Sequence, residues 1–101
     1  MATKIAYLQG EDGYWPASLL DPESYPMPET SCSGFFTFAL AWGVNNGYLE
    51  KKEFQPIVEK GWQVLVKAVY SNGKLGWVQS VGQDPKTVAQ DMTEVYGVGA
   101  F

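Results

Sequence analysis

The most constraining feature of the sequence is a helix-length segment that is apolar on every side. Residues 35–44 read Phe, Phe, Thr, Phe, Ala, Leu, Ala, Trp, Gly and Val, so a helix built from them has no polar face. A helix of this kind belongs in an interior. A chain of 101 residues has little mass with which to surround it, because small domains leave much of their surface exposed. We therefore expect this segment to be an inner element of a larger fold.

Capping and turn residues give the boundaries of this helix. We predict that it runs from about Thr30 to Asn46, within a helical region 30–47. Thr30, Ser31 and Ser33 are the candidate N-caps, and Gly47 is a normal helix stop. Trp42 is expected in the core.

A second helix is predicted within the region 53–70, and it has one apolar face only. Its apolar residues recur at steps of three and four. They are Phe54, Ile57, Val58, Trp62, Leu65, Val66 and Val69, with Gly61 on the same face. Pro56 fits near the start of a helix. Trp62 is expected in the core, and the opposite face in solvent.

The remaining regions are predicted mainly as loops. Region 1–29 is rich in turn formers, with a short strand expected at 4–9. Region 71–92 contains the turn signal Asn72-Gly73, an extended segment at 74–79 and a helical turn at 86–91. Region 93–101 begins a third, apolar helix, in which the chain ends. We expect one incomplete domain.

Two similar units indicate how these helices are arranged. Trp15 and Trp77 stand 62 positions apart in similar loops, and Glu29 and Glu94, 65 apart, each precede an apolar helix. Repeated helix pairs stack so that neighbours bury what one unit leaves exposed. The alternation of an apolar helix with a one-sided helix predicts two concentric layers, with the apolar helices inside.

The composition excludes several classes of chemistry. The chain has no His, seven basic residues that are all Lys, and a net charge of −4. It therefore has no imidazole base or ligand, no guanidinium clamp, and no basic surface for nucleic acid. Cys32 is the single cysteine, so an internal disulfide is impossible, and we expect an inert buried thiol. We predict no metal and no cofactor, and no segment resembles a signal peptide or a membrane span, which leaves the localisation unknown.

An ordered series of motifs resembles one enzyme family. They are Asp12-Gly13-Tyr14-Trp15, Leu19-Leu20-Asp21-Pro22, Glu29-Thr30-Ser31, Ala39-Leu40-Ala41-Trp42-Gly43, Gly76-Trp77-Val78-Gln79 and Thr93-Glu94-Val95-Tyr96-Gly97. The chain from Asp12 onward resembles the C-terminal part of the unsaturated rhamnogalacturonyl hydrolases, glycoside hydrolase family 105.

The resemblance implies an all-α, partial (α/α)6 toroid with inner and outer helices, long loops and room for a short hairpin. Such enzymes hydrate the unsaturated galacturonyl group of pectin (rhamnogalacturonan) oligosaccharides by means of an Asp in the N-terminal half of the family. This chain has no counterpart of that half. We therefore expect no catalytic residue here, and an inactive fragment that forms a homo-oligomer or requires a complementing chain.

Five residues are candidates for substrate contact. Trp15 and Trp77 lie in loops that enter the predicted inner helices, and an indole can stack on a sugar ring. Packing of the loop against the helices is the alternative for both. Glu29 and Glu94 precede inner helices, where helix capping is the alternative. Asp12 belongs to the same loop as Trp15, and the alternative for it is a turn.

A different class of function stays open. The chain can be a stand-alone module that keeps the aromatic loops to bind carbohydrate or to self-associate. Binding of sugar without hydrolysis distinguishes this module from an enzyme fragment.

Overall fold

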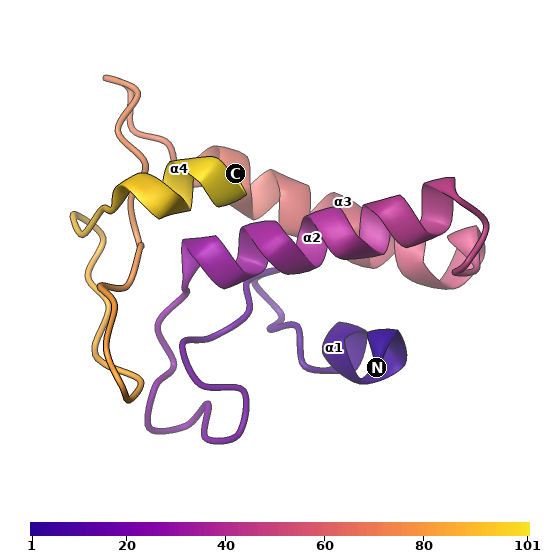
Figure 1. Ribbon diagram of the computed structural model, residues 1–101, viewed down its shortest axis with the longest axis horizontal. Coiled ribbons are helices and arrows are strands. Elements are labelled where there is room, and N and C mark those ends of the chain that lie inside the picture. The colour runs from indigo at the N-terminus through magenta and orange to yellow at the C-terminus, as the bar shows by residue number, and fades with distance from the viewer.

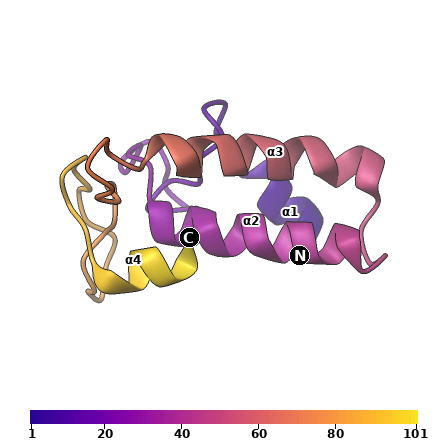
Figure 2. The ribbon, with the colours of Figure 1, turned by 90° about the horizontal axis from the view of Figure 1, so that it is seen from above.

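The computed structural model describes residues 1–101 and contains four helices. They are α1 (Ala2–Tyr7), α2 (Thr30–Asn45), α3 (Lys51–Lys67) and α4 (Val95–Ala100). Helix α2 lies between α3 and α4 (Figure 2). Helices α2 and α4 begin at the same end of the molecule, while α3 runs in the opposite direction (Figure 1). The all-α class is confirmed, and the partial toroid stays a prediction.

The buried face of α2 consists mainly of small and hydroxyl residues. They are Thr30, Ser33, Gly34, Thr37 and Gly43, together with Leu40. A Cβ on Gly34 would lie 2.8 Å from the backbone oxygen of Ala100 in α4, and a Cβ on Gly61 in α3 would collide with the Thr37 hydroxyl. The small residues therefore let α2 approach both neighbouring helices closely.

Several large side chains of α2 point away from the chain, whereas Phe36 and Leu40 face the core around Trp15. Phe38 is 67% exposed and Trp42 is 50% exposed, where its ring stacks on Tyr48. On α4, Val95 and Val98 are exposed as well. We use the name apolar face for the exposed apolar side chains of α2 and α4, namely Phe35, Phe38, Trp42, Val95 and Val98. The chain alone does not enclose its apolar helix, as the sequence led us to expect.

The prediction that Trp42 and Trp62 lie in the core is wrong for this chain. Trp62 is half exposed and packs beside Phe101, with ring centroids 5.5 Å apart. Both tryptophans lie on surfaces that no other element of the chain covers. Helical spacing places a residue on a face, but it does not supply the partner that buries the face.

Helix α3 begins earlier than predicted and buries a slightly different face. It starts at Lys51, so Pro56 is its sixth residue rather than part of the first turn. Pro56 has no N–H to donate to the carbonyl of Lys52, four residues before it, and both residues are exposed. The buried residues are Phe54, Gly61, Val64 and Leu65; the sequence pattern missed Val64, and Val66 points outward.

The N-terminal segment forms α1 where a strand was predicted at 4–9. Its apolar residues Ala2, Ile5 and Ala6 pack against a core cluster of Trp15, Leu40 and Phe54. The Trp15 indole N–H donates to the carbonyl of Ile5 at 2.8 Å. The helix is favoured because its apolar side completes this core, which a local pattern of six residues does not reveal. None of the helices is long and apolar enough to cross a bilayer.

The second loop region is extended and has no helical turn at 86–91. Asn72-Gly73 lies in a tight turn, and the hairpin that follows is reduced to one bridge between Val69 and Leu75. Val78 donates its N–H to Met92, so the segments 75–78 and 90–92 pair side by side. This pairing, and the bond from the Lys86 N–H to the side chain of Gln79, replaces the predicted helical turn.

Candidate functional site

The Glu29 carboxylate organises the start of α2. Glu29 is the N-cap, and its two oxygens accept from the backbone N–H groups of Ser31 at 3.2 Å and Cys32 at 2.8 Å. The Ser31 hydroxyl also donates to it, at 2.9 and 2.8 Å to the two oxygens. A carboxylate is favoured here because helix N-termini present unpaired N–H groups and a partial positive charge. Glu29 therefore caps the helix, which was the alternative to substrate contact. The predicted caps Thr30, Ser31 and Ser33 lie inside the helix.

The same carboxylate holds a segment that is distant in sequence. The Gln79 backbone N–H donates to Glu29 at 3.1 Å across 50 residues. Next to it, the Thr30 N–H donates to the Trp77 carbonyl at 2.9 Å, and the Thr30 hydroxyl donates to the Gly76 carbonyl at 2.7 Å. Segment 76–79 is therefore fixed against the first turn of α2.

Trp77 adopts a strained backbone within this segment. Its φ is 59°, a left-handed conformation that a bulky residue rarely adopts. The bonds from Thr30 and from the Trp77 N–H to Gln90 hold it there. Strain of this kind persists where surrounding contacts impose it, and it concentrates at functional sites.

A cavity with several polar side chains lies beside this segment, where α2 and α4 begin. We call it the Glu29 pocket; it has a volume of about 310 Å³ and is lined by Ala17, Glu29, Ser31, Cys32, Gln79, Ser80, Val81, Gly82 and Tyr96. Glu94 reaches it through Ser80, whose hydroxyl donates to the Glu94 carboxylate at 3.2 Å. The Tyr96 hydroxyl donates to the Gln79 carbonyl. Two carboxylates and three hydroxyls are thus associated with one cavity.

The two weak acids of the pocket stay protonated at neutral pH. Burial, followed by the charge of Glu29, raises the pKa of the Cys32 thiol far above its ordinary value. Desolvation and the charges of Glu94 and Glu29 raise the pKa of Tyr96. Cys32 is therefore no nucleophile, as the sequence predicted, and Tyr96 acts as a neutral hydrogen-bond donor.

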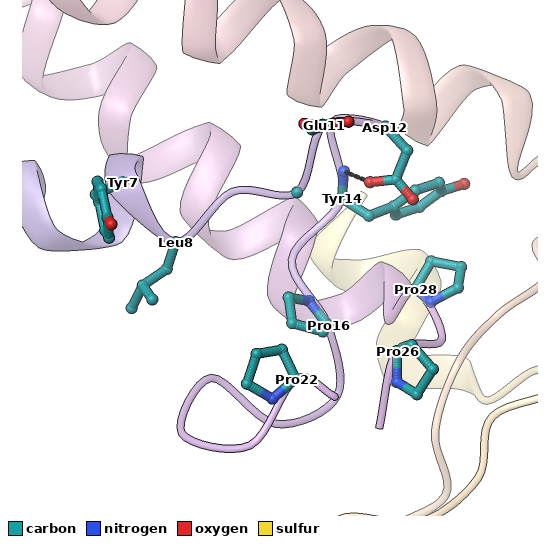
Figure 3. Close-up of a pocket in the computed structure, with 10 residues that line it drawn as sticks. Tyr7, Leu8, Glu11, Asp12, Tyr14, Pro16, Pro22, Pro26 and Pro28 are labelled. Carbon is teal, nitrogen blue, oxygen red and sulfur yellow. Dashed lines mark hydrogen bonds between the residues drawn. The ribbon is translucent and has the colours of Figure 1, made fainter. Parts of the chain in front are cut away.

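A larger cavity lies on the other side of the loop and contains Asp12. Its volume is about 540 Å³, and its lining includes Tyr7, Glu11, Asp12, Tyr14 and four prolines. Figure 3 shows Pro16, Pro22, Pro26 and Pro28 grouped on one side of it. The Asp12 carboxylate accepts a hydrogen bond from the Tyr14 N–H at 3.1 Å (Figure 3). Asp12 therefore has the role in a turn that was the alternative to substrate contact.

A short antiparallel pairing separates the two cavities. Pro16 and Pro28 form a bridge and line the larger cavity, whereas the next residues, Ala17 and Glu29, line the Glu29 pocket. Successive residues of extended chain point to opposite faces, so this pairing is the wall between the cavities. The candidates Asp12 and Glu29 consequently belong to different cavities.

Trp15 has no surface for a ligand in this structure, so its predicted sugar contact is corrected to core packing. It is 0% exposed, and its ring meets Phe36 edge to face at 5.5 Å. Trp77 is half-buried and does not line either cavity. The structure thus brings Glu29 and Glu94 to the Glu29 pocket and leaves the other three candidates outside it.

The other polar residues of the pocket, Ser31, Gln79, Ser80 and Tyr96, were not singled out from the sequence as site residues. Ser31, Gln79 and Tyr96 belong to the motifs that carry the family resemblance, whereas Ser80 had no signal in the sequence. No group of three side chains in the chain has the composition and proximity to hold a metal ion.

Comparison with known proteins places the chain in a family. The sequence profile of Glycosyl Hydrolase Family 88 matches residues 1–101. An unsaturated 3S-rhamnoglycuronyl hydrolase of Formosa agariphila is 48% identical over 101 residues, which are 100% of this chain and 27% of that protein. The chain therefore spans about a quarter of the length of this relative.

Two solved structures have the same fold over this region. A family 88 glycosyl hydrolase of Bacteroides vulgatus superposes with a TM-score of 0.93 at 43% identity, over 100% of this chain and 30% of that one. A possible member of family GH105 from Salmonella enterica has a TM-score of 0.80 at 25% identity, over 98% of this chain and 27% of that one. The resemblance to unsaturated rhamnogalacturonyl hydrolases is confirmed, and the chain belongs to Glycosyl Hydrolase Family 88.

Proposed function

We propose that this chain forms part of a glycoside hydrolase that hydrates the unsaturated galacturonyl group of pectin (rhamnogalacturonan) oligosaccharides. The observation that carries the proposal is the Glu29 pocket, at the end where the parallel helices α2 and α4 begin. A cavity with several convergent polar groups is the usual form of a small-ligand site. Family membership makes a sugar the ligand class, and this pocket is the wall that the chain contributes to the substrate cleft.

The acid that protonates the substrate is expected outside this chain. Four donors already surround the two Glu29 oxygens, with the Ser31 hydroxyl proton shared between both, and the residue is 6% exposed. A carboxylate offers about four lone-pair sites, so Glu29 has none to direct at a substrate. Glu29 therefore fixes the loop, and the chain alone is inactive.

The apolar face supports a partner chain that supplies the missing chemistry. Helices α2 and α4 contain no charged residue, and Phe35, Phe38 and Val95 are largely exposed. An uncovered apolar surface of this kind is typical of an interaction site. The rest of a family member, which makes up about three quarters of the Formosa relative's length, is the complementing partner of this proposal.

A complementation assay tests the proposal. The assay uses two substrates, an unsaturated rhamnogalacturonan disaccharide and an unsaturated 3S-rhamnoglycuronyl oligosaccharide of the kind that names the Formosa hydrolase. Hydrolysis of either removes the ultraviolet absorbance of its conjugated double bond. We expect no turnover by the 101-residue chain, and turnover when it is mixed with the part of the Formosa hydrolase that it does not match. Turnover by this chain alone contradicts the assignment of the acid to another chain, and an inactive mixture contradicts the enzyme-fragment proposal.

A stand-alone carbohydrate-binding or self-associating module is the second candidate. The same two features favour it, because the Glu29 pocket and the apolar face are present without any other chain. Sugar binding by a stable homo-oligomer, combined with an inactive mixture in the complementation assay, is the result that favours this module.

A further inference from the structure

We infer that the Glu29 pocket binds a neutral sugar ring and excludes the charged uronyl group of the substrate. The inference rests on the proposed function, since it assigns the part of the oligosaccharide that lies against this chain. Two independent features support it, namely the charges around the pocket and the direction of its hydrogen bonds.

The charges around the pocket are mostly negative. Glu29 lines it while almost fully buried, and Glu94 accepts a bond from the lining residue Ser80. The one ammonium group near it is that of Lys86, which lies beside Gly82 on the exposed rim. Water and salt screen an exposed charge far more than a buried one. A carboxylate in the pocket therefore meets net repulsion.

The hydroxyl protons of the pocket are already donated to other groups. The Ser31 hydroxyl donates to Glu29, the Ser80 hydroxyl to Glu94, and the Tyr96 hydroxyl to the Gln79 carbonyl. Each hydroxyl has one proton, so these three groups offer a ligand mainly lone pairs. Among the lining side chains only the Gln79 carboxamide, whose oxygen accepts from the Lys86 N–H, can still donate freely, so the pocket favours a ligand that donates hydrogen bonds.

A neutral sugar meets both conditions, and a uronate meets neither at its charged end. Sugar hydroxyls donate as well as accept, whereas an ionised carboxylate only accepts. The volume of about 310 Å³ lies at the small end of ligand sites, which suits one ring rather than two. The unsaturated uronyl group is then bound by the complementing chain, next to the catalytic acid.

Two methyl glycosides that differ only at C6 test the inference. Methyl α-galactopyranoside has a neutral hydroxymethyl group there, and methyl α-galacturonoside has a carboxylate. Amide NMR titrations of the full 101-residue chain at pH 7 should show the neutral glycoside shifting Ser31, Gln79 and Ser80. The uronide should bind roughly tenfold more weakly, since like charges within a few ångströms repel strongly in a partly buried site.

Charge-removing variants identify the cause. Glu94 is half-buried, and its carboxylate accepts one side-chain hydrogen bond, from Ser80. Glu94→Gln should therefore preserve the fold and narrow the affinity difference between the two glycosides several-fold. Glu59→Gln, on the exposed side of α3, is the matched control and should change nothing. Glu29→Gln should also narrow the affinity difference between the two glycosides. This variant can disturb the fold as well, because the Glu29 carboxylate accepts the Gln79 N–H.

Three results overturn the inference. They are equal or tighter binding of the uronide, loss of uronide binding in Lys86→Gln with the neutral glycoside unaffected, and absence of any amide shift up to the solubility limit of the neutral glycoside. The complementation assay separates these failures from failure of the proposed function. Restored hydrolysis without the neutral preference refutes only the inference, whereas the preference without restored hydrolysis refutes only the proposed enzyme fragment.

Discussion

Helices α2 and α3 lie side by side and have nearly equal lengths, 16 and 17 residues, but they divide their side chains in opposite ways. Helix α3 turns apolar residues such as Phe54 and Leu65 inward and its charged residues outward. Helix α2 buries mainly small and hydroxyl residues and exposes Phe35, Phe38 and Trp42, and it has no charged residue. The difference agrees with the prediction that α3 belongs to an outer layer and α2 to an inner one, with one side of α2 uncovered in this chain.

The largest effect is expected on the inward face of α3. Leu65 is buried and Val66, its neighbour, is half exposed. Leu65→Ala should lower the free energy of unfolding by about 2–5 kcal/mol, because it leaves a cavity in the core. Val66→Ala should cost less than about 1 kcal/mol. Urea denaturation measures both, and similar losses would show that α3 is not one-sided.

The close contact between the two helices gives the next largest effect. In Gly61→Ala the new Cβ would meet the Thr37 hydroxyl and lie 3.3 Å from the Thr37 Cβ. Overpacking of this kind costs about 1–3 kcal/mol. Gly99→Ala in α4 is the control, because nothing lies within 4 Å of its Cβ. If Gly61→Ala is as stable as the parent chain in thermal unfolding, the close approach of α2 and α3 at Gly61 does not contribute to stability.

The buried start of α2 should make stability depend on alkaline pH. The pKa of Cys32 is raised in the folded chain, mainly by burial, so the unfolded chain loses this proton first as the pH rises. The free energy of unfolding is then constant below the ordinary thiol pKa of about 8.5, and it falls by roughly 1 kcal/mol by pH 9.5. Urea denaturation at several pH values between about 7.5 and 9.5, roughly one unit on each side of that thiol pKa, measures how steeply the free energy of unfolding falls with pH. Cys32→Ala should remove it, and an unchanged slope in that variant would assign the effect to other groups.

The smallest effect on stability is expected on the apolar face. Phe38→Gln removes an exposed ring, so it should change the free energy of unfolding of the monomer by about 0.5 kcal/mol or less. The same variant should weaken self-association, or association with a complementing chain, in sedimentation velocity experiments. A large loss of stability without any change in association would place Phe38 in the core of this chain and remove the contrast between α2 and α3.

The sequence predicted the elements that depend on long periodic patterns. Helices α2 and α3, the apolar start of α4 and the capping role of Glu29 all follow from spacing and helix-end chemistry over several turns. The short helix α1 could not be predicted, because its six residues are helical through contacts with Trp15 and other distant residues.

The candidate site was predicted only in part for a similar reason. Glu29 and Glu94 stand at helix starts, which a sequence marks, but Ser31, Gln79 and Ser80 join them through bonds that span up to 50 residues. Whether a tryptophan is buried or exposed also depends on partners that are distant in sequence. Trp15, a candidate for sugar contact, is therefore buried, and Trp42, which was expected in the core, is half exposed.

The bond between Glu29 and Gln79 has a consequence for biosynthesis. The first turn of α2 leaves the ribosome fifty residues before the amide that completes its cap. Until then the Glu29 carboxylate has only the amides and hydroxyl of its own turn, and the wall of the pocket is missing. Long-range closure of this kind is slow compared with helix formation. The Glu29 pocket is therefore among the last parts of the nascent chain to take shape, after the helices that frame it.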